Sequence, residues 1–80
     1  MIEMLLSEAR NEKIVKIVSI NASKGAKHKL LSLGLHPNDI IQILSNPSFG
    51  PLLIKNISKD NARIAIGRGI AQKIQVESIN

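Results

Sequence analysis

The sequence predicts a mainly β protein with one helix, folded as a small SH3-like β-barrel of about five strands, with the helix between the first and second strands. Three observations predict this fold class. Short segments rich in Ile, Leu and Val alternate with turn-forming residues. A clear helical period is confined to 21–34. The length of 80 residues suits a single domain spanning 1–80. The alternative, a ferredoxin-like α+β sandwich, needs a second full helix, whereas 70–73 offers one helical turn.

The strands are expected where β-branched residues gather between turn signals. The first is 13–20, whose sequence KIVKIVSI favours an extended chain. The others are expected at 40–44, 52–57, 62–66 and 74–79. In the fourth strand, the alternation places Ala62, Ile64 and Ile66 toward the core.

The helix is expected to begin at Ser23, whose hydroxyl can accept a backbone N–H of the first turn. Ala26, Leu30 and Leu33 follow at helical spacing and share one face, so Leu30 and Leu33 are expected in the core. Leu31, which lies beside this face, and Leu35, which follows the end of the helix, are expected to be at least partly exposed.

The helix ends at an abrupt stop in the sequence LLSLGLHPND. Gly34 stands where a helix end needs a left-handed residue, and Leu35 would then fold back on Leu30. Pro37 forbids continuation of the helix, and the pair at 38–39 supplies turn chemistry. The stop therefore predicts a rigid elbow that leads directly into a strand.

The amino-acid composition favours some classes of binding partner and weighs against others. Eleven Lys and Arg against six acids give a net charge of +5, which suits an anionic partner. Phe49 is the sole aromatic residue, which weighs against stacking on single-stranded nucleic acid and against binding Pro-rich peptides. No nucleic acid is expected as a partner. The absence of cysteine, of a signal peptide and of a long apolar run predicts a cytoplasmic protein without direct membrane insertion.

The inventory of reactive side chains does not predict an enzyme. The six acids are dispersed and form no pair for acid–base catalysis. His28 and His36 are the only histidines, and no carboxylate or thiolate lies between them to complete a metal site. The segment GRG at 67–69 lacks the spacing of a phosphate loop. No catalytic residue, cofactor or metal is therefore expected.

Three segments resemble the ferrous iron transport protein A (FeoA) family. KLLSLGLHPND at 29–39 resembles that family's helix ending L-x-x-L-G-[LM]-x-P-G, through Leu30, Leu33, Gly34 and Pro37. SFGP at 48–51, with Gly50 and Pro51, resembles its turn between strands, and 62–76 resembles its C-terminal part. The resemblance covers roughly 13–78. Departures are Asn38 in place of a glycine, Gly69 and Ile70 in place of acidic residues, and a basic residue displaced to Arg68.

The resemblance implies an SH3-like fold, a cytoplasmic location, no enzyme activity and a partner, the membrane ferrous iron transporter of the FeoB type. Members are regarded as accessory or regulatory proteins of that transporter, which carries a cytoplasmic GTP-binding domain. Similar modules form the C-terminal domain of iron-dependent repressors of the DtxR type.

Protein–protein interaction with this transporter is thus the first hypothesis for the function. The candidate partner-binding residues surround the helix stop: Lys27, His28, Leu31, Leu35, His36 and Pro37. One alternative is a nucleic-acid-binding SH3-like barrel, which the charge favours. Another is a regulator of GTP hydrolysis that supplies Arg10, Arg63 or Arg68 to the transporter's GTP-binding domain.

Overall fold

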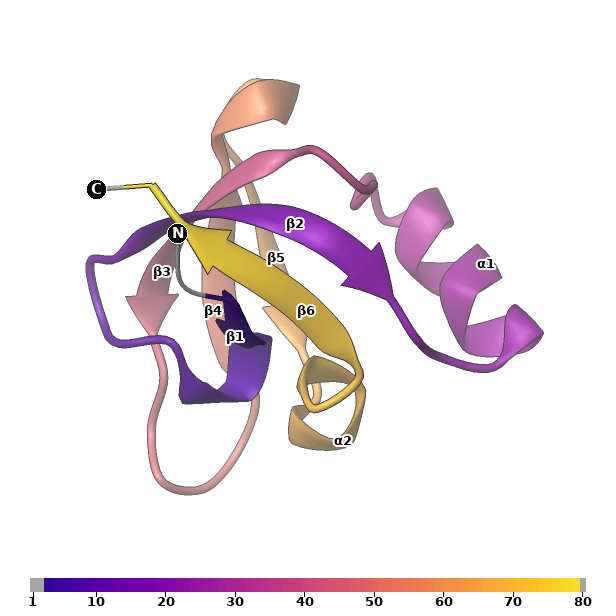
Figure 1. The fold of residues 1–80 in the computed structure, drawn as a ribbon, viewed down its shortest axis with the longest axis horizontal. Coiled ribbons are helices and arrows are strands. Elements are labelled where there is room, and N and C mark those ends of the chain that lie inside the picture. Colours follow the sequence, from indigo (N-terminus) through magenta and orange to yellow (C-terminus); the bar gives the residue numbers. More distant parts are fainter. Residues whose placement is uncertain (1–2, 80) are drawn as a thin grey trace.

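The computed structural model describes residues 3–79, which form a six-stranded antiparallel sheet curled into an open barrel (Figure 1). The strands are β1 (Glu3–Leu5), β2 (Ile14–Ile20), β3 (Ile40–Ser45), β4 (Leu52–Asn56), β5 (Ala62–Ile66) and β6 (Ile74–Ser78). The helices are α1 (Lys24–Ser32) and α2 (Arg68–Ala71), with single 3-10 turns η1 (Leu6–Glu8) and η2 (Ile57–Lys59).

The strand order in the sheet is β1-β6-β2-β3-β4-β5, and every neighbouring pair is antiparallel. β1 and β5 are the edges, so hydrogen bonds do not close the barrel. The expected mainly β, SH3-like fold with its helix between 13–20 and 40–44 is confirmed. The ferredoxin-like alternative is wrong, because α2 has four residues only.

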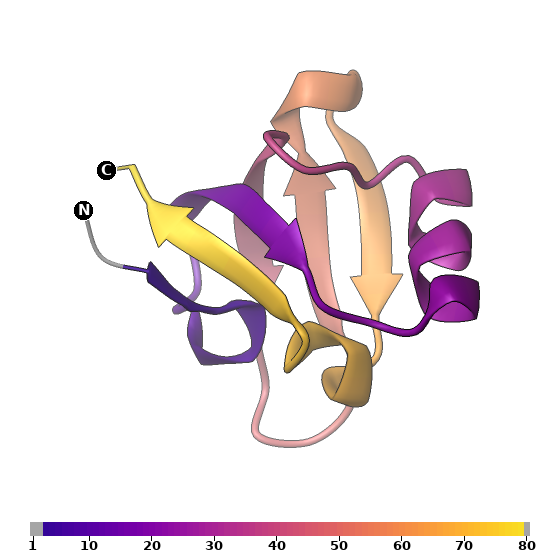
Figure 2. The same ribbon diagram turned by 45° about the vertical axis from the view of Figure 1, so that its right-hand side comes forward.

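Two irregularities help the sheet to curl. The pairing of β2 with β6 shifts between Ile17 and Ser19, and the pairing of β3 with β4 shifts between Ile43 and Ser45. Such bulges bend a strand and increase its local twist. They lie in the two strands that flank α1 in the sequence, so the sheet wraps around a single interior (Figure 2).

That interior is almost entirely aliphatic, as expected for a chain with a single aromatic residue. The buried apolar residues are Leu6, Ala9, Val15, Ile17, Ile20, Leu30, Leu35, Ile41, Ile43, Leu52, Ile54, Ile64, Ile66, Ala71, Ile74 and Val76. Every strand from β2 to β6 contributes to this set, through alternate residues except where the register shift in β2 moves the next buried residue to Ile20.

The structure differs from the sequence-based prediction at two places. β1 adds a sixth strand, in which Met4 pairs with Val76 of β6. This strand is three residues long and is held by a distant partner, so no local periodicity signals it. Ala62 is exposed instead of facing the core, because it begins the edge strand β5 directly after the turn, beyond the end of the apolar interior.

Helix α1 stands at one side of the barrel (Figures 1 and 2). Its start is as expected, since the Ser23 hydroxyl accepts the Ala26 N–H at 3.2 Å. Leu30 is its one buried residue, so most of the helix surface is open. Within residues 3–79, no helix has the length and apolar character needed to cross a membrane.

Candidate functional site

The stop of α1 has the predicted geometry. Gly34 has a φ of 91°, in the left-handed region that favours glycine. The Leu35 N–H donates to the Leu30 carbonyl and the Gly34 N–H to the Leu31 carbonyl, both at 3.0 Å. These two bonds define the Schellman motif, which satisfies the last carbonyls of the helix. Gly34 and Leu30 therefore act as the sequence predicts.

Leu33 and Leu35, the leucines on either side of Gly34, have the opposite exposure to the one that the sequence predicts. Leu35 was expected on the surface, but it is 0% exposed. Leu33 was expected in the core, but it is 47% exposed. The left-handed residue between them reverses the chain, so Leu35 turns under the helix and packs in the core while Leu33 stays on an open flank. Leu35 is therefore excluded as a contact residue.

The elbow, residues 34–39, is fixed to the barrel by backbone bonds. The Asn38 N–H donates to the Ile17 carbonyl at 2.7 Å, and the Ile17 N–H donates to the Asp39 carbonyl at 2.9 Å. Asn38 has a φ of 74°, a conformation that asparagine tolerates better than most residues. The side chain of Asp39 also accepts the His36 N–H at 2.9 Å. The elbow is thus joined to β2 and closed on itself.

A buried polar cluster supports the elbow from β4 and η2. The Asp39 carboxylate accepts bonds from Asn56 Nδ2 at 2.9 Å and from Lys59 Nζ at 3.0 Å. Burial by itself raises the pKa of Asp39. The bonds from Asn56, Lys59 and the His36 N–H, together with the Lys59 charge, outweigh burial and hold the pKa below its ordinary value of 3.8. Asp39 therefore stays ionised and keeps the elbow closed at neutral pH.

Three of the six candidate partner-binding residues meet on one flank of α1. Lys27, Leu31 and Pro37 line a shallow depression of about 190 Å³, with Ile20 contributing to it. We call these four residues the elbow surface. Leu31 is 43% exposed, as expected, and Lys27 and Pro37 are also exposed. The surface combines an apolar floor with one cation.

The two histidines do not line this depression. His28 is exposed on α1. The His36 side chain is 41% exposed, and its Nδ1 is buried 3.6 Å from Asp39 Oδ2 without a hydrogen bond. In the part of the chain that the structure describes, no three His, Cys, Asp or Glu side chains gather in a way that could hold a metal ion.

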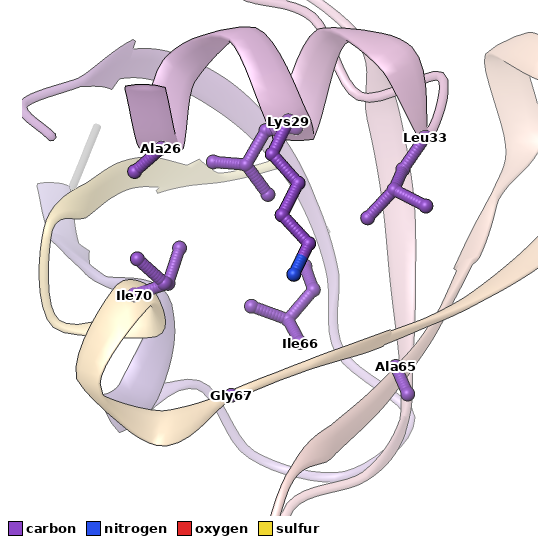
Figure 3. A pocket seen from close by; sticks show the side chains of 8 residues that line it. Ala26, Lys29, Leu33, Ala65, Ile66, Gly67 and Ile70 are labelled. Carbon is purple, nitrogen blue, oxygen red and sulfur yellow. The ribbon is translucent and has the colours of Figure 1, made fainter. Parts of the chain in front are cut away.

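The opposite flank of α1 holds a larger groove that the sequence did not indicate. It has a volume of about 270 Å³ and lies between α1, the end of β5 and α2. Its lining consists of Ala26, Lys29, Leu30, Leu33, Ala65, Ile66, Gly67 and Ile70. Figure 3 shows Lys29 extending from the helix across the groove toward β5. The groove was missed because its two walls are about forty residues apart in the sequence, and the motifs at 29–39 and 62–76 do not show that they face each other.

The turn at 48–51 contains Gly50 and Pro51, which the sequence singles out as structural residues. Gly50 has a φ of 90°, which explains the glycine, and Pro51 leads directly into β4. Arg68, which the sequence offers as a displaced basic residue and as a candidate arginine finger, hydrogen-bonds to this turn through Nε to the Gly50 carbonyl at 3.3 Å. Apart from the family resemblance, the feature of the sequence that marks the turn is the sole aromatic residue, Phe49, placed between Pro47 and Pro51.

The fold and the elbow together define a small β-barrel module of the SH3-like class, with a rigid partly apolar surface beside its helix. Residues 4–78 match the sequence model of the FeoA domain, and the chain belongs to this family. The resemblance drawn from 29–39, 48–51 and 62–76 is confirmed.

Individual relatives agree with this assignment. A Methanocaldococcus jannaschii protein, provisionally named Fe(2+) transport protein A, is 36% identical over 72 residues, or 90% of this chain and 83% of that protein. A crystal structure described as an iron uptake regulatory protein (FeoA) superposes with a TM-score of 0.88 at 32% identity, covering 98% of this chain and 100% of the other. A manganese-dependent transcriptional repressor has a TM-score of 0.87 at 22% identity, over 96% of this chain and 42% of the repressor, which shows a shared fold alone.

Proposed function

We propose that this chain is a small cytoplasmic accessory protein of a ferrous iron uptake system, which regulates a membrane ferrous iron transporter of the FeoB type by direct contact. Family membership and the relative named as an Fe(2+) transport protein A support the iron uptake role. The protein has no catalytic activity of its own in this proposal. It acts by occupying a surface of the transporter.

The observation that carries the proposal is the elbow surface. Leu31 and Pro37 offer exposed apolar area, and Lys27 offers a charge that complements an acidic partner. The Schellman motif fixes the elbow at its start, and the Asp39 cluster fixes it at its end. A surface that is already ordered loses little conformational entropy on binding, so its few contacts translate efficiently into affinity.

The two alternative hypotheses receive less support from the side chains. Arg68, one candidate arginine finger, directs its guanidinium to the loop at 46–51 and is not free to enter a GTP-binding site. Arg10 and Arg63 are exposed and remain the residues to test by GTP turnover of the transporter. For nucleic acid, a single aromatic side chain does not form a platform for successive bases.

The test is capture of the transporter's cytoplasmic and membrane parts, separately, with this protein as bait. Leu31→Glu and Lys27→Glu place negative charge on the elbow surface and are expected to reduce capture about tenfold or more. Leu33→Glu is the matched control, because Leu33 has similar exposure on the opposite flank of the same helix. It should bind like the parent protein.

Circular dichroism should be unchanged for all three variants, since each replaced side chain is exposed. If the Leu31 and Lys27 variants are folded and capture the transporter as the parent does, the elbow is purely structural and the docking face lies elsewhere. If the parent itself captures neither part, the proposed partner is wrong.

A further inference from the structure

Phe49 is the most exposed large apolar side chain among residues 3–79. It is 88% exposed and lies in the loop 46–51, which joins β3 to β4 and projects from one end of the barrel (Figures 1 and 2). The loop contains no charged residue. The chain thus places its sole Phe, Trp or Tyr side chain in a projecting loop that has no charged residue of its own.

The projection is held in place by polar contacts. Arg68 donates from Nη2 to Asn46 Oδ1 at 2.8 Å and to the Pro47 carbonyl, and from Nε to the Gly50 carbonyl at 3.3 Å. These bonds connect both ends of the loop to α2. Asn46 also donates through Nδ2 to the carbonyls of Ser7 and Ala9, at 3.0 and 2.7 Å, which connects the loop to the η1 region. Phe49 is therefore presented by an ordered loop, and its docking costs little entropy.

The groove between α1, β5 and α2 has the size and chemistry to receive such a ring. Its volume is about 270 Å³, and an apolar cavity of roughly 150 Å³ is enough to bind benzene. Leu33, Ile70 and Ala65 supply apolar walls. Lys29 crosses the opening (Figure 3), where an ammonium group can lie over the face of a bound aromatic ring.

The Phe49 loop and the groove both contact one short segment, residues 67–68. Gly67 lines the groove, and Arg68 directly after it binds the Phe49 loop. Gly67 and Gly69 are exposed, have no left-handed φ, and would meet no atom within 4 Å if they carried a Cβ. Gly67 is the N-cap of α2, a position that suits glycine, so Gly69 is the one for which the isolated chain gives no steric or backbone reason. A bare backbone there does allow a second surface to approach closely.

We propose that the groove receives Phe49 of a second copy of this chain, in a reciprocal two-fold dimer centred on residues 67–69. The ring does not fill the groove of its own chain, since it is 88% exposed. Because ring and groove adjoin the same segment, two copies related by a two-fold axis exchange both contacts at once, which closes the assembly. The loop itself has no charged residue, so the cations at this contact are Arg68, which is bonded to the loop, and Lys29 in the groove.

This dimer leaves the elbow surface free, because that surface lies on the other flank of α1 and shares no lining residue with the groove. The inference is therefore independent of the proposed function. The salt dependence also distinguishes the dimer from binding to the transporter. Salt screens the repulsion between like charges and so strengthens an apolar dimer of a basic protein, whereas it weakens attraction to an acidic partner.

The experiment is sedimentation equilibrium of the purified full chain over a range of concentrations up to millimolar, in low and high salt. The parent protein is expected to show a concentration-dependent dimer that is stronger in high salt. Phe49→Ser removes the ring, and Ala65→Glu blocks the groove, and each should weaken dimerisation about tenfold or more. Phe49→Leu keeps an apolar side chain and should retain most of the association.

A mixture of the Phe49→Ser and Ala65→Glu variants gives the decisive result. The first retains an intact groove and the second an intact ring, so the mixture should form a heterodimer more strongly than either variant associates with itself. A parent protein that is monomeric at millimolar concentration overturns the proposal. So does a Phe49→Ser variant that dimerises like the parent, or a mixture without rescue.

Discussion

The side-chain amide of Asn56 donates a hydrogen bond of 2.9 Å to the carboxylate of Asp39, and both residues are buried. The same nitrogen donates to the Gly34 carbonyl at 2.9 Å. One side chain of β4 therefore joins the first residue of the elbow to the last. The elbow is held in shape from inside the fold as well as by its own backbone.

Because Asn56 bonds to both ends of the elbow, replacing it is expected to lower the stability of the protein. Asn56→Leu removes donors from Asp39 and Gly34 and removes the acceptor of the Ser58 N–H, while it introduces no large change in volume. Loss of buried partners should lower the free energy of unfolding by about 1–3 kcal/mol in chemical denaturation. Gln42→Leu is the control, since Gln42 makes a single exposed bond to the Glu12 carbonyl, and it should change stability by less than about 0.5 kcal/mol. Equal effects of the two substitutions would contradict this role.

Gly34→Val should destabilise the protein by more than about 1 kcal/mol, because a β-branched residue resists the left-handed conformation at φ 91°. A Cβ at Gly34 would meet nothing within 4 Å, so the cost comes from the backbone and not from a clash. Gly25 lies within α1 and is equally open. Gly25→Ala should therefore stabilise the helix by about 0.5–1 kcal/mol. Melting temperatures that move in the same direction for both variants would disprove the argument.

The free energy of unfolding should decrease on acidification because Asp39 becomes protonated. Its pKa in the folded protein lies below the ordinary 3.8, so the folded state favours the ionised carboxylate. This contribution is fully present above 3.8 and is lost as the pH falls below 3.8 through the folded value. Unfolding measured from neutral to acidic pH should show this loss in the parent. Asp39→Asn should be less stable at neutral pH and lose less on acidification; an unaltered pH dependence would exclude Asp39 as its source.

The two histidines are not expected to bind ferrous or zinc ions tightly. His28 lies on the open surface of α1, and the Nδ1 of His36 points inward to an Asp39 carboxylate that Asn56 and Lys59 already engage. Titration calorimetry should detect no micromolar binding, in the parent or in the double variant His28→Ala, His36→Ala. Binding that this double variant abolishes would establish a metal site at the helix stop.

Local chemistry in the sequence was sufficient to predict helix α1, strands β2 to β6 and the helix stop. The Ser23 cap, the left-handed Gly34 and the tolerance of Asn38 each depend on residues within one turn of the chain, so they could be predicted directly. The strands of 13–20, 40–44, 52–57, 62–66 and 74–79 were also found, with end shifts of about one residue. The family resemblance rested on these same local features.

The site was predictable only in part, because exposure depends on how elements pack. Lys27, Leu31 and Pro37 meet on the elbow surface as their positions suggested. Helical spacing alone placed Leu33 in the core and left Leu35 outside, which the reversal at Gly34 inverts.

The sequence by itself thus determined where the chain turns and which segments form the five strands β2 to β6, since those choices are made by neighbouring residues. Tertiary structure alone decided the pairing of β1 with β6, the groove between α1 and the β5–α2 segment, and the buried partnership of Asp39 with Asn56. Each of these brings together residues distant in the chain. Their interaction depends on burial and hydrogen bonding that exist only once the barrel has formed.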